Sequence, residues 1–104
     1  MTENIISAEI EPMPNKANQA AIALQRMGFK VLHIGLTISV QGPQSLCESI
    51  FNVSFETRKK TVVSEAEGAE AAFQKALTEN MRIPLELKDL VAKVMFTEPP
   101  EFIK

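Results

Sequence analysis

The sequence predicts a small α+β domain in which two helices cover one face of a four-stranded antiparallel sheet. Two observations carry this prediction. The hydrophobic period changes from that of a strand to that of a helix at Asn15, and again at Pro43. The short turn Gly35-Leu36 separates two strand-like runs, and a connection this short requires the two strands to pair antiparallel.

The first strand and the first helix each follow a regular pattern. Apolar and polar residues alternate over residues 4–11, which indicates a strand with one apolar face. Residues 15–27 carry apolar side chains at spacings of three and four, as an amphipathic helix does. We expect Asn15 to be the N-cap of this helix and Gly28 to be the left-handed residue that ends it.

The next two strands form the predicted hairpin. Residues 29–34 are almost continuously apolar, which favours a central place in the sheet. Residues 37–41 alternate and place Ile38 and Val40 on one face. Two sets of side chains from residues 29–34 remain candidates for the buried face: either Phe29, Val31 and His33, or Leu32 and Ile34.

A second helix and a fourth strand complete the predicted sheet. Pro43 suits the first position of a helix because its missing N–H would have no partner there, and this helix ends near Asn52. Alternation over residues 53–63 indicates the fourth strand, which gives the ferredoxin-like order βαββαβ. The large buried side chains are expected to be Phe29, Val31, Ile38, Val40, Leu46, Ile50, Phe51 and Phe55.

The last third of the chain is predicted to add a helical extension and a short strand. Ser64 and Glu67 have the spacing of a capping box, which predicts a helix over residues 64–77. A short helical turn is expected to open at Ile83-Pro84, and residues 94–97 read as a strand.

The length of 104 residues fits one domain, which we place at residues 1–97. Residues 98–104 are expected to form an extended tail, because Pro99 and Pro100 favour extended backbone. The formal net charge of −2 gives no basic surface for nucleic acid. No apolar run is long enough for a membrane span, and the N-terminus lacks the pattern of a signal peptide, so we expect a cytoplasmic protein.

Residues with catalytic chemistry are few. The single cysteine, Cys47, excludes an intrachain disulfide and zinc sites built from several cysteines. The single histidine, His33, lies in an apolar run, and no glycine-rich phosphate loop is present. We therefore predict no catalytic residue, no metal site and no cofactor, and an enzyme is the least favoured class.

One family resemblance covers most of residues 24–96, with a less similar insert over residues 57–82. The chain resembles the prodomains of sedolisin-type serine peptidases, such as the kumamolisins. The first group of matching residues is Gly28, Phe29, Val31, Leu32, Gly35, Ile38, Ser39, Val40, Gly42, Leu46 and Phe51. A second group resembles the segment that precedes the mature enzyme in this family: Ile83, Pro84, Leu87, Val91 and Val94. Subtilisin-type propeptides look alike in fold.

The resemblance implies a ferredoxin-like domain that binds a serine peptidase, helps it to fold and blocks its active site. It also implies that residues 97–104 lie extended in the active-site cleft, with Phe102 and Ile103 in side-chain pockets. The sequence carries no catalytic domain, so we expect either an excised prodomain or a free-standing relative, and no catalytic residue is carried over. Met1 and the lack of a signal-peptide pattern favour the free-standing relative. The residues expected to bind the partner are Pro99, Pro100, Glu101, Phe102, Ile103 and Lys104.

Two classes of function therefore stay open. The first is a protein-binding module, an inhibitor or folding chaperone of a subtilisin- or sedolisin-type peptidase. The second is a structural or assembly protein that forms a homo-oligomer through its sheet. Neither class calls for nucleic acid or a membrane as a partner.

Overall fold

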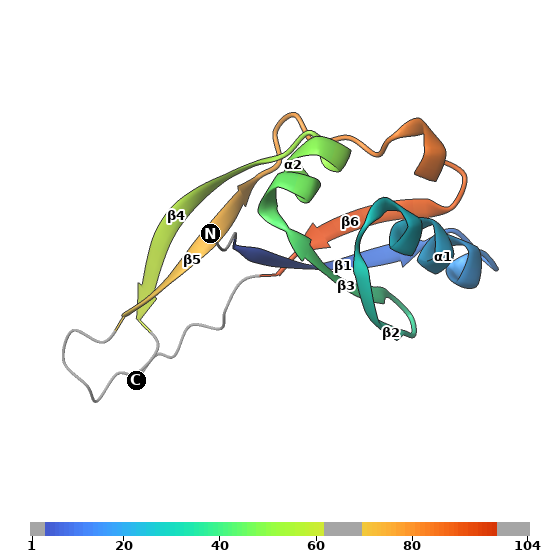
Figure 1. Ribbon diagram of the computed structural model, residues 1–104, viewed down its shortest axis with the longest axis horizontal. Coiled ribbons are helices and arrows are strands. Elements are labelled where there is room, and N and C mark those ends of the chain that lie inside the picture. Colours follow the sequence, from blue (N-terminus) through green and yellow to red (C-terminus); the bar gives the residue numbers. More distant parts are fainter. Residues whose placement is uncertain (1–3, 62–69, 98–104) are drawn as a thin grey trace.

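The computed structural model describes residues 4–61 and 70–97, and it is an α+β structure (Figure 1). Four strands form an antiparallel sheet in the order β2-β3-β1-β6, and β4 and β5 form a separate two-stranded sheet. The elements in chain order are β1 (Ile5–Pro12), α1 (Ala17–Met27), β2 (Lys30–Ile34), β3 (Ile38–Pro43), α2 (Gln44–Phe51), β4 (Ser54–Thr61), β5 (Glu70–Leu77), the 3-10 helix η1 (Leu85–Leu87) and β6 (Val91–Phe96).

The first strand, β1, is central to the larger sheet. It pairs antiparallel with β3 on one side, where Glu9 lies opposite Ser39. On its other side it pairs antiparallel with β6, where Glu9 lies opposite Met95. The predicted hairpin of β2 and β3 is confirmed as antiparallel, and the Gly35 N–H donates to the Thr37 carbonyl at 2.9 Å within its turn.

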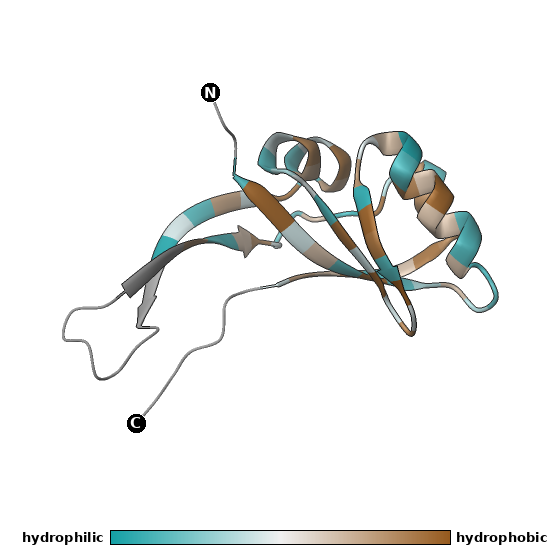
Figure 2. Ribbon diagram, turned by 60° about the horizontal axis from the view of Figure 1, so that its bottom comes forward, coloured by the Kyte–Doolittle hydropathy of each residue, from teal (hydrophilic) through white to brown (hydrophobic). Residues whose placement is uncertain are grey.

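Both helices lie on the same face of this sheet, and the hydrophobic core lies between them and the strands (Figure 2). Of the eight large side chains expected in the core, four are buried and the other four are half-buried against them. Three phenylalanine rings form a chain of contacts: the centroid of Phe51 lies 5.9 Å from that of Phe29 and 6.2 Å from that of Phe96. The buried hydrophobic residues are Ile6, Ala8, Ile10, Ala20, Ala21, Leu24, Phe29, Ile38, Val40, Cys47, Phe51, Val53, Leu87, Val91 and Val94.

The helix ends agree with the sequence in part. Gly28 ends α1 in the left-handed conformation, with φ of 113°, as predicted. The prediction of Asn15 as N-cap is wrong: Asn15 itself is left-handed, with φ of 64°, and Lys16 occupies the cap position without a side-chain hydrogen bond. The prediction of Pro43 as the first helical residue is also wrong by one position. Pro43 has an extended backbone, and α2 begins at Gln44.

The predicted central position of β2 is wrong, because β2 is an edge strand of the sheet. Phe29 is buried and Val31 is half-buried on the helix side, while Leu32 and Ile34 are 49% and 44% exposed. The pairing with β3 is irregular between Val31 and His33, so the run does not keep a single alternation. The run is continuously apolar because Phe29 and Val31 pack against the core, whereas Leu32 and Ile34 are apolar side chains exposed at the edge of the sheet.

The predicted fourth strand does not join the larger sheet. Instead, β4 pairs with β5, and the two strands form an arm that projects from the domain (Figure 1). The fourth strand of the larger sheet is β6, which pairs with β1. The edge-to-face contact between Phe55 and Phe96, with centroids 5.6 Å apart, holds the base of the arm to the sheet.

The predicted helix over residues 64–77 is also wrong where the structure describes it. Residues Glu70–Leu77 form a strand, because pairing with β4 satisfies their backbone groups and outweighs the helix propensity of their alanines. The capping box of Ser64 and Glu67 lies outside the described residues. In the part described, the expected C-terminal helical extension is one 3-10 turn, η1, which follows Ile83-Pro84.

Candidate partner-binding face

The face of the sheet opposite the helices is polar, and no described element lies over it. Ile6, Ala8 and Ile10 point into the core, so the residues between them on β1 point to the other side. Side chains directly opposite each other on antiparallel strands lie on the same face of the sheet. The residues of β3 and β6 that pair in register with these β1 residues, and the β2 residues opposite those of β3, therefore lie on this face too. We call this surface the open face; its residues are Ser7, Glu9, Glu11, Lys30, His33, Thr37, Ser39, Gln41, Lys93 and Met95.

Glu9 is at the centre of the open face and is held by two hydroxyl groups. The Thr37 hydroxyl donates to Oε1 of Glu9 at 2.6 Å. The Ser39 hydroxyl lies 2.9 Å from Oε1 and 2.8 Å from Oε2 of the same carboxylate. These bonds favour the charged form of the carboxylate and fix its orientation.

The pKa of Glu9 is lowered from its ordinary value by these contacts. The hydrogen bond from Thr37 has the largest effect, followed by the bond from Ser39. Partial desolvation opposes the shift, and the charge of His33, which lies opposite Ser39, adds to it. The result is an oriented carboxylate that is ionised at neutral pH.

The bonds to Glu9 predict a measurable change in its titration. Replacing Thr37 with valine, or Ser39 with alanine, should raise the pKa of Glu9 toward its ordinary value of 4.5. Because the native pKa is lowered, the bonds stabilise the fold above pH 4.5, and this contribution is lost as the pH falls through the native pKa. Carbon-13 NMR of the carboxyl group measures the titration. Gln41→Ala is the control, and an unchanged pKa in both hydroxyl variants would contradict the assignment.

His33 and Cys47 do not come together. His33 lies on the open face opposite Ser39, whereas Cys47 is buried in the core on the helix side of the sheet. Burial, with a smaller contribution from Glu48, raises the pKa of the Cys47 thiol to about 11. A neutral, buried thiol packs as a small apolar side chain, as predicted.

The sequence-predicted binding residues are not those of the open face. Pro99, Pro100 and the rest of the tail to Lys104 lie outside the described residues. The cluster around Glu9 was missed, although the alternation of residues 4–11 marked one face of that strand as polar. The cluster depends on the pairing of β1 with β3, which brings Glu9 beside residues 28 and 30 positions further along the chain.

Residues 4–61 and 70–97 contain no group of three or more acidic, histidine or cysteine residues that could hold a metal ion. None of the helices in these ranges has the length and apolar character to cross a membrane. Comparison with family models, with curated proteins and with solved structures gives no match to the chain.

Proposed function

We propose that the chain is a non-enzymatic protein-binding module that contacts its partner through the open face. The observation that carries the proposal is the carboxylate of Glu9, held by Thr37 and Ser39 at the centre of a polar sheet face that no described element covers. Holding a charged acceptor in one orientation before binding reduces the ordering cost of an interface. The partner surface that fits it presents N–H groups or basic side chains.

The partner that we propose is a subtilisin- or sedolisin-type serine peptidase, which the chain would inhibit or help to fold. The resemblance to peptidase prodomains suggests this partner, and the core supports it in one respect. Its residues Phe29, Ile38, Val40 and Phe51, which carry the resemblance, are buried together. Residues 57–82, which depart from it, include most of the β4–β5 arm.

We also propose that the domain is ferredoxin-like, with the arm inserted before the last strand. The order β2-β3-β1-β6, with α1 after β1 and α2 after β3, supports this if β6 is counted as the fourth strand. We further propose that residues 97–104, the tail, lie in the peptidase cleft. We also propose a cytoplasmic location.

The test is binding to a panel of subtilisin- and sedolisin-type peptidases whose nucleophile has been replaced, so that the chain is not digested. We expect Glu9→Gln to weaken binding by roughly tenfold to a hundredfold, as loss of hydrogen bonds to a charged group does. Glu79→Gln is the control, because Glu79 is exposed and outside the open face. Titration calorimetry measures the affinity.

Two results would contradict the proposal. One is no binding to any peptidase of the panel at tens of micromolar. The other is equal affinity of the Glu9 and Glu79 variants, which would remove the open face from the interface. A chain that ends at Phe96 separates the roles: it should still bind through the open face but should lose inhibition of active peptidase.

A second candidate function, self-assembly, is favoured by the edge strand β2. Its side chains Leu32 and Ile34 are half-exposed, and Leu36 in the adjoining turn is 98% exposed. An unpaired apolar edge can pair with the same edge of a second copy, because a two-fold axis makes the contact self-complementary. This assembly would give a continuous sheet across two copies.

Sedimentation equilibrium at micromolar concentration tests self-assembly. We expect Leu32→Lys and Ile34→Lys to convert a dimer to a monomer, while Ile5→Lys, at an exposed position outside β2, leaves it unchanged. A wild-type chain that is monomeric at every concentration would exclude this assembly. It would leave the peptidase proposal in place, since that interface uses another surface.

A further inference from the structure

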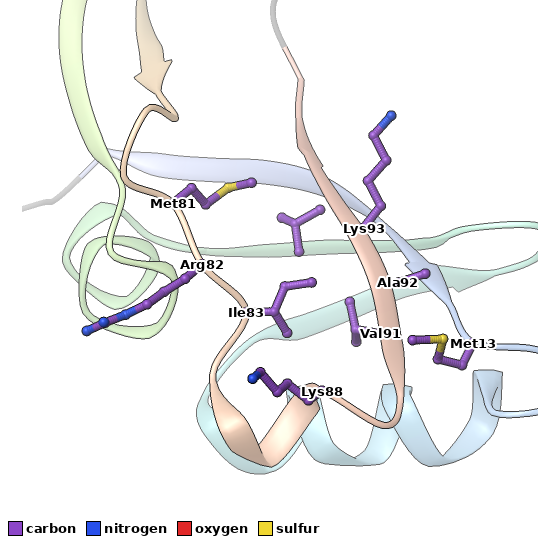
Figure 3. Close-up of a pocket in the computed structure, with 9 residues that line it drawn as sticks. Met13, Met81, Arg82, Ile83, Lys88, Val91, Ala92 and Lys93 are labelled. Atoms are coloured by element: carbon purple, nitrogen blue, oxygen red, sulfur yellow. The ribbon is translucent and has the colours of Figure 1, made fainter.

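A cavity lies beside the other edge of the sheet, between β6 and the segment of residues 81–83. Its volume is about 510 Å³, within the range of ligand-binding clefts. Figure 3 shows Met81 and Ile83 pointing from the segment toward β6, and Val91 pointing from β6 toward the segment. We call this cavity the β6 groove; its main lining residues are Met13, Met81, Ile83, Lys88, Val91 and Val94.

The β6 groove lies against backbone groups that have no strand partner in the described part of the chain. The strand β6 is the last in the sheet order and pairs with β1 alone. The Thr97 N–H donates to the Ser7 carbonyl, and this bond shows which residues of β6 direct their backbone groups toward β1. Because bonding direction alternates along an antiparallel strand, the N–H and C=O of Val94 point away from β1. The backbone bonds described for residues 81–83 go to Thr78 and Phe51, not to β6.

The charged residues that line the β6 groove are all basic, and Glu11 lies opposite Lys93 on the neighbouring strand. The groove lining includes Arg82, Lys88 and Lys93 and no acidic residue. Lys88 lies next to Ile83 and Lys93 extends from β6, whereas Arg82 points away (Figure 3). Neither lysine forms an ion pair with a described residue. An apolar floor with unpaired lysines beside it suits a ligand that is both apolar and acidic.

We propose that the β6 groove binds an extended acidic-apolar segment of a partner protein as an additional strand of the sheet. The backbone of the segment pairs with the free edge at Val94. Alternate apolar side chains enter the groove against Ile83, Val91 and Val94, and the acidic side chains between them lie on the side of Lys93. Lys88 adds positive charge on the groove side. Lys93 selects against a basic strand by like-charge repulsion. Glu9 does not line the groove, and Lys93 stands where the groove meets the open face. The inference does not rest on the proposed peptidase partner.

The experiment is a titration of the full chain, labelled with nitrogen-15, with a capped peptide of alternating glutamate and valine. The control peptide replaces each glutamate with lysine. We expect the amide signals of Ile83, Ala92 and Val94 to shift and saturate with the acidic peptide, and to stay unchanged with the basic one. Signals of β2, at the far edge, should not move.

Charge reversal provides the second readout. The double variant Lys88→Glu, Lys93→Glu should bind the acidic peptide at least tenfold more weakly and should now bind the basic peptide. The matched control, Arg26→Glu with Lys30→Glu, makes the same change in net charge at exposed residues outside the groove lining and should keep the original preference. Shifts that do not saturate, that centre on β2, or that show no preference between the peptides in the wild-type chain would overturn the proposal.

Discussion

Replacing Phe51 with alanine should lower the free energy of unfolding by about 3–5 kcal/mol, the range for a buried phenylalanine. Phe51 is fully buried and ends α2, where its ring contacts those of Phe29 and Phe96. The substitution therefore removes contacts with Phe29, which directly precedes β2, and with Phe96 at the end of β6. A cavity would remain between these two rings.

Urea denaturation followed by far-UV circular dichroism measures the loss from Phe51, because the chain has no tryptophan or tyrosine for fluorescence. Leu36→Ala is the control: this side chain is 98% exposed, so its loss should change stability by less than about 0.5 kcal/mol. A loss below about 1 kcal/mol for Phe51→Ala would mean that α2 does not pack as described.

Replacing Leu87 with alanine should cost about 2–5 kcal/mol. Leu87 is fully buried, and it is the residue through which the single 3-10 turn of η1 enters the core. Leu87 belongs to the same buried cluster as Val91 and Val94 of β6, so it anchors the segment between the arm and β6 in the core. Loss of the side chain should therefore loosen the strand that completes the sheet.

The same turn supplies a matched control for Leu87. Leu85 is the same residue type two positions earlier and is 80% exposed, so Leu85→Ala should be nearly neutral. Urea denaturation of the two variants gives the comparison. Equal losses of unfolding free energy for Leu85→Ala and Leu87→Ala would contradict the arrangement in which η1 buries Leu87 and exposes Leu85.

Local patterns predicted the elements that depend on neighbouring residues. The alternation of residues 4–11, the helix ending at Gly28 and the tight turn at Gly35 each arise within a few residues, and each is confirmed. Phe51 is buried as expected because apolar spacing alone marks the inner side of a short helix.

Pairing between distant strands could not be predicted in the same way. The alternation of residues 53–63 is satisfied equally by a place beside β1 or by a partner such as β5, so it did not identify the neighbour. The apolar run of β2 gave no information about which strand ends the sheet. The Glu9 cluster was missed for the same reason, since Ser39 and Thr37 look like ordinary outward-facing residues until β1 and β3 are aligned.

The pairing of β1 with β6 has a consequence for the kinetics of folding. It joins Ala8 to Phe96, near the two ends of the described chain, and the arm lengthens the loop that must close. Loop-closure entropy grows slowly with length, so the arm costs little stability. Contacts this distant in sequence raise the contact order, which slows folding. Deleting the arm should therefore accelerate refolding, while α1, α2 and the β2–β3 hairpin form from local contacts before β6 joins the sheet.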